Sequence, residues 1–509
     1  MINYMAGNPV LILGPALLFA LGLFPGGNFF LGLLLILPMT LGFSYAYGFL
    51  TAAIPRTGGD YTLISRIIHP AAGVVAGICQ AVAAFLSVAF FGIAFVTTGL
   101  GPGLVSWGLI DDHPRLVSWG ATLETSHGWQ IGIGSAMIIG AGLIYVGGWH
   151  YTVRIQFALF VATIIGILIA LITGLVISHQ HFINDFNSFA QPFTNSSNSY
   201  GDVIAKAQDG GIVTNAPFSF SNTIPIVAVL AGFVIYTYFS TYIGGELRRG
   251  GTLGTAHRMA AAGIIQTIGL LICVLIVFNT FGKSFLTAAY AGGMPDEIPA
   301  PPFYFFLTGV VFNSGVLAFI IALTYCAFWP LQTSVALLSP NRMLFAFSFD
   351  GILPKSVANV TSRHTPLVAV SISSALSIAS LVWAVQASDF FQVLVYATLI
   401  QLVAMTLIGI TAMIFPWRRP ELYRASVSNR TILGIPAVSI AGAAATVSGV
   451  LLYIIFIHYT SLGFSNTGKF VTFAVGTVGV ALLLYVGAFL YRRSQGTDLN
   501  LVYAEIPPE

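Results

Sequence analysis

The stretch from Thr223 to Arg249, TIPIVAVLAGFVIYTYFSTYIGGELRR, decides how the rest of the chain is interpreted. It begins as an apolar helix that approaches the ~20 residues needed to cross a bilayer. Its middle carries Gly232 and the hydroxyl side chains of Tyr236 and Thr237, where a lipid-facing span would carry leucine and isoleucine. A helix that loosens there exposes backbone groups, which a cavity, a ligand or an ion must satisfy. A packing seam between helices uses the same residue types, so the stretch alone leaves both interpretations open.

The composition places the chain in a membrane. Of its 509 residues, 57% are hydrophobic and 7% are charged, and the mean hydropathy is +0.90. A soluble chain carries about 25% charged residues, so lipid must be the solvent for this one. A net charge of +3 without a basic tract gives no reason to expect nucleic-acid binding. The three cysteines, Cys79, Cys273 and Cys326, are dispersed through apolar segments and predict neither disulfides nor a metal site.

Apolar segments of membrane-spanning length predict an all-α polytopic membrane protein with 12 transmembrane helices. The predicted spans cover residues 1–24, 29–54, 71–100, 131–148, 155–177, 223–245, 259–281, 303–338, 367–385, 390–415, 435–457 and 470–490. An even number of spans puts both termini on the same side of the membrane.

The lysines and arginines predict which side that is. Of the 19, all but four fall in one set of loops and the C-terminal tail. The four on the other side are Arg115, Lys206, Lys283 and Lys469. Because cytoplasmic loops carry the excess of basic residues, both termini are predicted to be cytoplasmic, in the plasma membrane.

The order of the segments suggests an internal repeat. The third and eighth segments are the long ones and lie five places apart, and the first and sixth both contain small and polar residues at a candidate break. Five is an odd number, so a second set of five helices must be inverted relative to the first. This predicts a transporter core over 1–415, with repeats over about 1–178 and 223–415. An extracellular loop over 179–222, two extra helices over 416–491 and a cytoplasmic tail over 492–509 complete the predicted organisation. The long external loop can cap a cavity or be a tolerated insertion, and the second interpretation is favoured.

Three stretches carry a family resemblance. Residues 52–70, AAIPRTGGDYTLISRIIHP, resemble the first cytoplasmic loop of the amino acid–polyamine–organocation superfamily. Residues 242–248, YIGGELR, resemble that family's sixth-helix ending. Residues 341–354, NRMLFAFSFDGILP, followed by Thr365-Pro366, resemble its eighth loop. The resemblance implies 12 helices, a five-plus-five inverted repeat like the leucine-transporter fold, and transport of amino acids or related amines.

Two departures from the family pattern stand out. The chain opens almost on the break of its first helix, so we expect the natural start to lie upstream of Met1. Tyr236 stands where many relatives have a glycine in the sixth helix.

The two breaks are the predicted substrate site. Pro9 lacks an N–H and disfavours helix at Asn8, which frees backbone groups for a carboxylate or an ammonium. By residues alone, an ordinary proline kink explains this stretch equally well, and the resemblance favours the site. The predicted substrate-binding residues are Met5, Ala6, Gly7, Asn8, Gly232, Ile235, Tyr236 and Thr237.

The resemblance, together with the residues that the spans lack, predicts which ion gradient drives transport. Relatives that use sodium place two adjacent hydroxyls on helix 8, where Thr333 and Ser334 stand here, and complete the oxygen cage with carbonyls such as that of Ala6. Helix packing explains two small hydroxyl residues as well. Residues 155–177 contain no lysine, so the lysine-type proton coupling of other relatives is not expected. Sodium coupling and uncoupled exchange remain, and no other cofactor or metal is predicted.

The first cytoplasmic loop is predicted to act as an inner gate or as a fixed structural turn. Paired glycines permit a tight turn, and the charged residues nearby can pair across the cytoplasmic mouth. The residues concerned are Arg56, Gly58, Gly59, Asp60, Arg66 and Glu246.

The favoured function is a secondary active transporter of amino acids or related amines that works by alternating access. The alternatives are an uncoupled exchanger, a receptor or a membrane enzyme. An enzyme is not expected, because no cluster of nucleophile, acid, base or metal ligands is apparent near the membrane surface.

Overall fold

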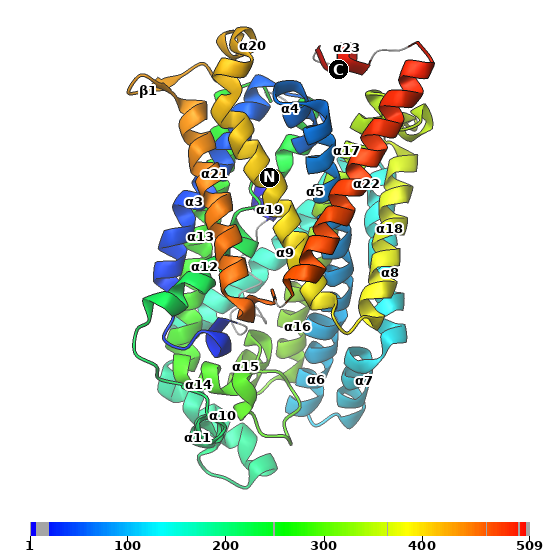
Figure 1. Cartoon of the computed structure of the whole chain (residues 1–509). Coiled ribbons are helices and arrows are strands. Elements are labelled where there is room, and N and C mark those ends of the chain that lie inside the picture. The colour runs from blue at the N-terminus through cyan, green and yellow to red at the C-terminus, as the bar shows by residue number, and fades with distance from the viewer. Residues whose placement is uncertain are drawn as a thin grey trace.

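The computed structural model describes residues 2–6, 20–247, 250–363, 365–464, 466–496 and 499–504. The described chain is a bundle of long helices with shorter helices at both ends (Figure 1). Its strands are β1 (Thr431–Ile432) and β2 (Ile435–Pro436), which pair as a short antiparallel hairpin.

Ten helical stretches of the described chain are long and apolar enough to span a membrane. Their mean hydropathies lie between 1.5 and 2.8, so lipid is a better solvent than water for their outer faces. In chain order they are α3 (Phe29–Ala53), α5 to α6 (Pro70–Ile110), α8 (His127–Val146), α9 (Trp149–Val176), α13 (Leu253–Phe281), α16 to α17 (Gly315–Phe349), α18 (Leu367–Gln386), α19 (Phe390–Arg418), α21 (Ala437–His458) and α22 (Thr467–Ser494).

The first and sixth predicted spans have a different form. The described part of the first is α1 (Ile2–Ala6), and the rest of that segment lies largely outside the described residues. The sixth is α12 (Phe220–Val234), a shorter apolar helix, followed by the 3-10 turns η3 (Phe239–Tyr242) and η4 (Gly244–Glu246).

Two predicted boundaries need correction. The third span continues beyond residue 100 through the π-helical turn η2 (Phe95–Leu100) into α6 (Gly101–Ile110). The eighth was predicted over 303–338, but α15 (Tyr304–Val311) is a separate helix, and the span is α16 (Gly315–Cys326) joined to α17 (Phe328–Phe349). Hydropathy misplaced this span because α15 is itself apolar and only three residues separate it from α16, whereas the second half of α17 carries Asn341 and Arg342.

Spans that are five places apart in the predicted order pack against each other. The second contacts the seventh through α3 and α13, the third contacts the eighth through α5 (Pro70–Ala94) and α17, and the fourth contacts the ninth through α8 and α18. Helix α19 packs against both α5 and α21, and α21 also contacts α3. The two sets of helices therefore share one apolar core.

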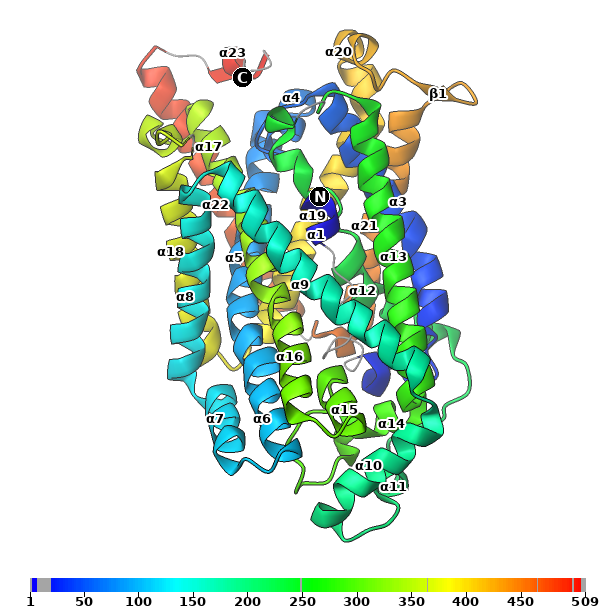
Figure 2. The same ribbon diagram turned by 180° about the vertical axis from the view of Figure 1, so that it is seen from behind.

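Short helices cover one end of the bundle, where α7 (Pro114–Thr125), α10 (His179–Thr194) and α11 (Ser199–Asp209) lie (Figure 2). The loop over 179–222, interpreted above as a tolerated insertion, contains the helices α10 and α11. Its buried side chains Phe182 and Phe186 pack against Phe285 of α14 (Lys283–Ala288). The buried apolar residues of α10 recur every four positions, at Phe182, Phe186 and Ala190, and so form the single helix face that docks.

The opposite end holds α4 (Asp60–Ile67), α20 (Pro420–Ala425) and α23 (Leu499–Ala504) (Figure 1). The arginines of the first cytoplasmic loop and of the C-terminal half gather there. This is the end that the lysine and arginine pattern predicts to be cytoplasmic.

Candidate functional site

The interruption of the sixth span is the central feature of the site. Helix α12 ends at Val234, with Ile235 as its cap, and the chain does not resume an α-helix before Glu246. The last carbonyls of such a helix lack partners within the helix. Gly232 was predicted within the break, but it lies inside α12. The break therefore starts at Ile235, because a single glycine is tolerated in a helix.

Aromatic stacking holds the chain beyond α12 in its non-helical path. The ring of Tyr238 stacks on Tyr47 of α3 with the centroids 4.1 Å apart, and on Phe239 at 5.5 Å. The Thr237 hydroxyl lies 2.6 Å from that of Ser44, also on α3. Thr237 thus faces α3 and is fully buried, so its predicted contact with substrate would compete with an existing hydrogen bond.

Helix α1 is tied directly to the interrupted segment. The Asn3 side-chain amide donates to the Ser240 hydroxyl, and the Ser240 backbone N–H donates to Asn3 Oδ1, both at 2.9 Å. Gln266 of α13 donates to the Asn3 carbonyl at 2.9 Å, and Gln332 of α17 donates to the Met5 carbonyl at 2.6 Å. Side-chain amides therefore satisfy carbonyls at the end of α1 that would otherwise be orphaned.

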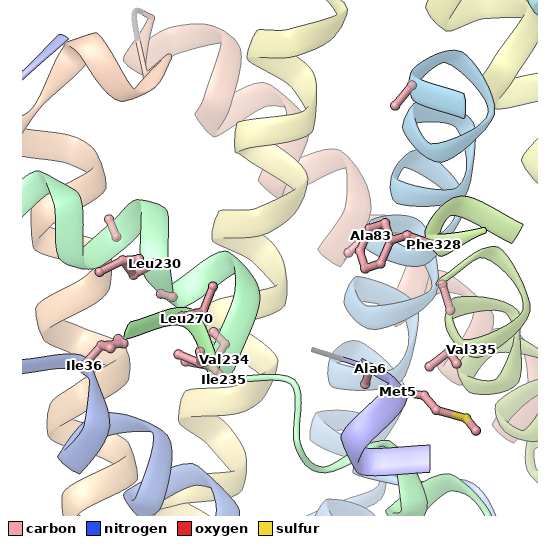
Figure 3. Packing of buried hydrophobic residues seen from close by; sticks show 14 of the residues in the cluster. Met5, Ala6, Ile36, Ala83, Leu230, Val234, Ile235, Leu270, Phe328 and Val335 are labelled. Carbon is pink, nitrogen blue, oxygen red and sulfur yellow. The ribbon is translucent and has the colours of Figure 1, made fainter. Parts of the chain in front are cut away.

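Several residues at the predicted substrate site are buried, on two separate elements. Met5 and Ala6 are buried on α1, and Val234 and Ile235 are buried at the end of α12, with apolar side chains of neighbouring helices around them (Figure 3). Gly7 and Asn8, the other two predicted residues of the first break, lie outside the described residues.

Tyr236 is the partly exposed polar side chain at the break. Its hydroxyl donates to Gln401 Oε1 on α19 at 3.3 Å, and the Gln401 amide reaches the Tyr238 hydroxyl at 3.5 Å. The three glutamines on α13, α17 and α19 were missed from the sequence. The sequence could have indicated them, because a glutamine inside an apolar span needs a polar partner.

Thr333 and Ser334 lie on α17 but face other helices. The Thr333 hydroxyl points to the sulfur of Met137 on α8 at 4.0 Å. The Ser334 hydroxyl accepts from the Gln156 amide on α9 at 3.1 Å and donates to its own helix. No hydrogen bond within the described part of the chain joins either hydroxyl to Ala6. The helix period explains this, because Gln332 takes the face of α17 toward α1 and its two successors turn away.

The first cytoplasmic loop is bonded to the interrupted segment. Gly58 and Gly59 have φ values of +113° and +57°, and a Cβ on Gly59 would lie 2.3 Å from ring atoms of Tyr242. The Gly58 N–H donates to the Tyr242 carbonyl at 3.2 Å, and Thr57 forms a β-bridge with Ile243. Only glycines permit this close approach of loop and segment.

Asp60 also stabilises the contact between the loop and the interrupted segment. Its buried carboxylate accepts hydrogen bonds from the hydroxyls of Tyr47, at 2.5 Å, and Tyr242. Burial raises the pKa of Asp60 above its ordinary value, and the hydrogen bonds from Tyr242 and Tyr47 oppose that rise. Two phenols thereby join α3, α4 and the interrupted segment through one carboxylate.

Two ion pairs join residues of the loop and of the interrupted segment to α17. Arg66 forms a two-pronged pair with Asp350 at the end of α17, with both distances 2.7 Å and both side chains 3% exposed. Glu246 accepts from Arg342 at 2.9 Å. The sequence predicted that Arg66 and Glu246 take part in a gate, but it did not identify Asp350 and Arg342 as their partners.

The C-terminal helix reaches the first of these pairs. Tyr503 of α23 places its ring 4.8 Å from the Arg66 guanidinium, and its hydroxyl lies 3.0 Å from that of Tyr61. The Tyr61 hydroxyl in turn donates to Asp350.

The site is therefore an interrupted helix whose non-helical segment contacts α1 inside a polytopic bundle and is bonded to the predicted first cytoplasmic loop. A family model described as "Amino acid permease" matches residues 2–483, which is nearly the whole chain. The search of curated proteins finds no match. Because the family model covers far more than half of the sequence, the chain belongs to the amino acid permease family, within the amino acid–polyamine–organocation superfamily.

Proposed function

We propose that this permease is a secondary active transporter of amino acids or related amines, working by alternating access in the plasma membrane with both termini cytoplasmic. The observation that carries the proposal is the end of α12 at Val234, inside the bundle, where the η3 turn that follows it contacts α1. The last carbonyls of α12 lack partners within that helix, and they suit the ammonium group of an amino acid or amine.

The contacts between spans support a five-plus-five inverted repeat. Each of three spans packs against the span five places later in the sequence. An inverted repeat provides two equivalent arrangements, one open to each side of the membrane. The proposed organisation has 12 spans, of which the last two lie outside the repeats.

The residues around the breaks suggest how a substrate is held. The buried Gln266 Oε1 has no hydrogen-bond partner among the described residues, although the amide of the same side chain binds α1. A buried carbonyl oxygen without a donor is costly, by about 1–3 kcal/mol, and a substrate ammonium would satisfy it. Tyr236 would cover the ligand and contribute its hydroxyl.

The coupling mode is proposed as sodium coupling or uncoupled exchange, and the second is the alternative function. In the sodium-coupled form, Thr333 and Ser334 must turn toward Ala6 from the faces on which they lie here. In the exchanger, they are packing residues of α17.

Reconstitution tests the proposal. Purified protein in liposomes is loaded with unlabelled amino acids, and uptake of a panel of labelled amino acids and polyamines is measured with a sodium gradient, with a proton gradient and with neither. Uptake that needs the sodium gradient supports the coupled transporter, and uptake that needs only internal amino acid supports the exchanger. If folded protein neither takes up nor exchanges any member of the panel, the proposed function is wrong.

A further inference from the structure

A cavity of about 590 Å³ lies at the end of the molecule that holds α4. Its walls come from the first cytoplasmic loop, the end of α17 and the segment from Val360 to Val370. Glu246, at the end of the interrupted segment, lines it, but no residue of α1 or from Ile235 to Gly245 does, so the predicted substrate site does not account for it.

Asn341 is the first sign that this cavity holds a ligand. The side chain lines the cavity and is 3% exposed, yet neither its Nδ2 nor its Oδ1 has a hydrogen-bond partner among the residues that the structure describes. A buried donor and a buried acceptor that make no hydrogen bond each cost about 1–3 kcal/mol of stability. A hydroxyl group both donates and accepts, so a hydroxyl-bearing ligand would satisfy both atoms.

The charges of the lining favour an anion. Four arginines face the cavity against two carboxylates. Asp350 is held by Arg66, and Glu246 is paired with Arg342. Arg363 is exposed, and none of the ion pairs within the described chain uses it. An anionic group at Arg363 would meet an excess of positive charge.

The lining also has an apolar part that reaches the surface. Phe349 and Val360 belong to the wall and are 53% and 51% exposed. A vestibule used only by water-soluble anions would need no apolar rim, whereas here Phe349 and Val360 share the exposed part of the lining with Arg363, and Asn341 lies inside. That distribution matches an amphiphile whose polar head enters the cavity and whose hydrocarbon leaves it.

We propose that the cavity binds an anionic phospholipid whose headgroup carries hydroxyls, with phosphatidylglycerol as the model. The phosphate lies at Arg363, the headgroup hydroxyls bind Asn341, and the acyl chains pass over Phe349 and Val360. The cytoplasmic leaflet is the anionic one, and basic pockets between helices on that side are suited to such headgroups. The site thus depends on the orientation proposed above but not on the transported substrate.

Native mass spectrometry of the detergent-solubilised protein tests this site with added phosphatidylglycerol, with phosphatidylcholine of the same chains, and with soluble glycerol 3-phosphate. We expect phosphatidylglycerol to bind at least about tenfold more tightly than either of the others, which corresponds to one charged contact. Equal binding of phosphatidylcholine would show a nonspecific annulus. Equal binding of glycerol 3-phosphate would show a free-anion site. Either result would overturn the proposal.

Variants separate the site from the rest of the surface. Arg363→Gln and Asn341→Leu are each expected to weaken phosphatidylglycerol binding about tenfold. Arg430→Gln, at an exposed arginine beside the β1 hairpin, is the matched control and should leave the binding unchanged. Arg363 is on the surface, so that variant tests the site even if Asn341→Leu does not fold. Unchanged binding in Arg363→Gln would refute the proposal whether or not the protein transports amino acids.

Discussion

The helix breaks and the first cytoplasmic loop use different chemistry to hold the same interrupted segment. At the breaks, neutral amides and hydroxyls contact backbone carbonyls, as Gln266 and Gln332 do on α1. At the loop, a buried ion pair joins Arg66 to Asp350, and a buried carboxylate ties down Tyr242. A hydrogen bond between neutral groups contributes a net of about 1 kcal/mol to stability. Removing one partner of a buried ion pair costs about 3–5 kcal/mol.

This difference indicates which region can rearrange. Neutral contacts can be exchanged for those of a ligand at little net cost, so the breaks are suited to binding and release. The loop contacts are costly to break singly, so the loop is suited to act as a fixed support or as a latch that opens as one unit. The predictions below test that contrast.

The largest expected effect comes from the buried ion pair. Asp350→Ala leaves the Arg66 guanidinium buried without its partner and should reduce stability by about 3–5 kcal/mol. Thermal unfolding monitored by size-exclusion chromatography measures the loss. Asp389→Ala, which breaks the exposed pair with Lys469, is the control and should cost less than about 1 kcal/mol. Equal losses in both variants would remove the contrast between the two regions.

Gly59→Ala should have the next largest effect. The new Cβ would collide with the Tyr242 ring at a positive φ, so we expect a loss of about 1–3 kcal/mol, seen as lower thermal stability. Gly476→Ala on α22 is the control, because a Cβ there meets no atom within 4 Å and alanine favours helix. A fully stable Gly59→Ala variant would show that the loop is not held as closely to the interrupted segment as described.

Tyr236→Phe tests the breaks. Removing the hydroxyl should leave the fold intact and weaken substrate affinity about tenfold or less, in keeping with one neutral hydrogen bond. Binding of whichever amino acid is transported is measured by scintillation proximity. Tyr453→Phe on α21, away from the breaks, is the matched control and should bind normally. Unchanged affinity in Tyr236→Phe would exclude the hydroxyl from the site.

The last prediction concerns Glu124 of α7, a carboxylate whose buried Oε1 has no hydrogen-bond partner within the described chain, in contrast to Asp350. Burial raises the pKa of Glu124 from 4.5 to about 7. The folded state therefore binds this proton more tightly than the unfolded state, so the contribution to stability falls as pH rises from about 4.5 to about 7. We expect Glu124→Gln to flatten that part of the profile of melting temperature against pH. An unchanged profile in the variant would assign the pH dependence to another group.

Several features of the fold could be predicted from the sequence because they depend on local composition. The boundaries of α3, α18 and α19 fall close to the predicted ones, since hydropathy changes sharply at their ends. The interruption after α12 was also predicted, because hydroxyl and aromatic residues follow one another in the middle of an apolar segment.

The partners within the site could not be predicted in this way. Asn3 binds Ser240, and Arg66 binds Asp350, across separations of 237 and 284 residues. One sequence without an alignment carries no signal for such pairs. The orientation of Thr333 and Ser334 was missed for the same reason, since a helix period does not say which face meets which neighbour.

The sequence by itself determined that lipid is the solvent, where most spans lie, and that the sixth segment is interrupted, because each follows from the transfer of local side chains and backbone out of water. Only the tertiary structure decided which groups satisfy the broken ends, which charges are paired, and that Asn341 faces a cavity without a partner. Those outcomes depend on the packing of segments that are distant in the chain, which local free energies of transfer do not specify.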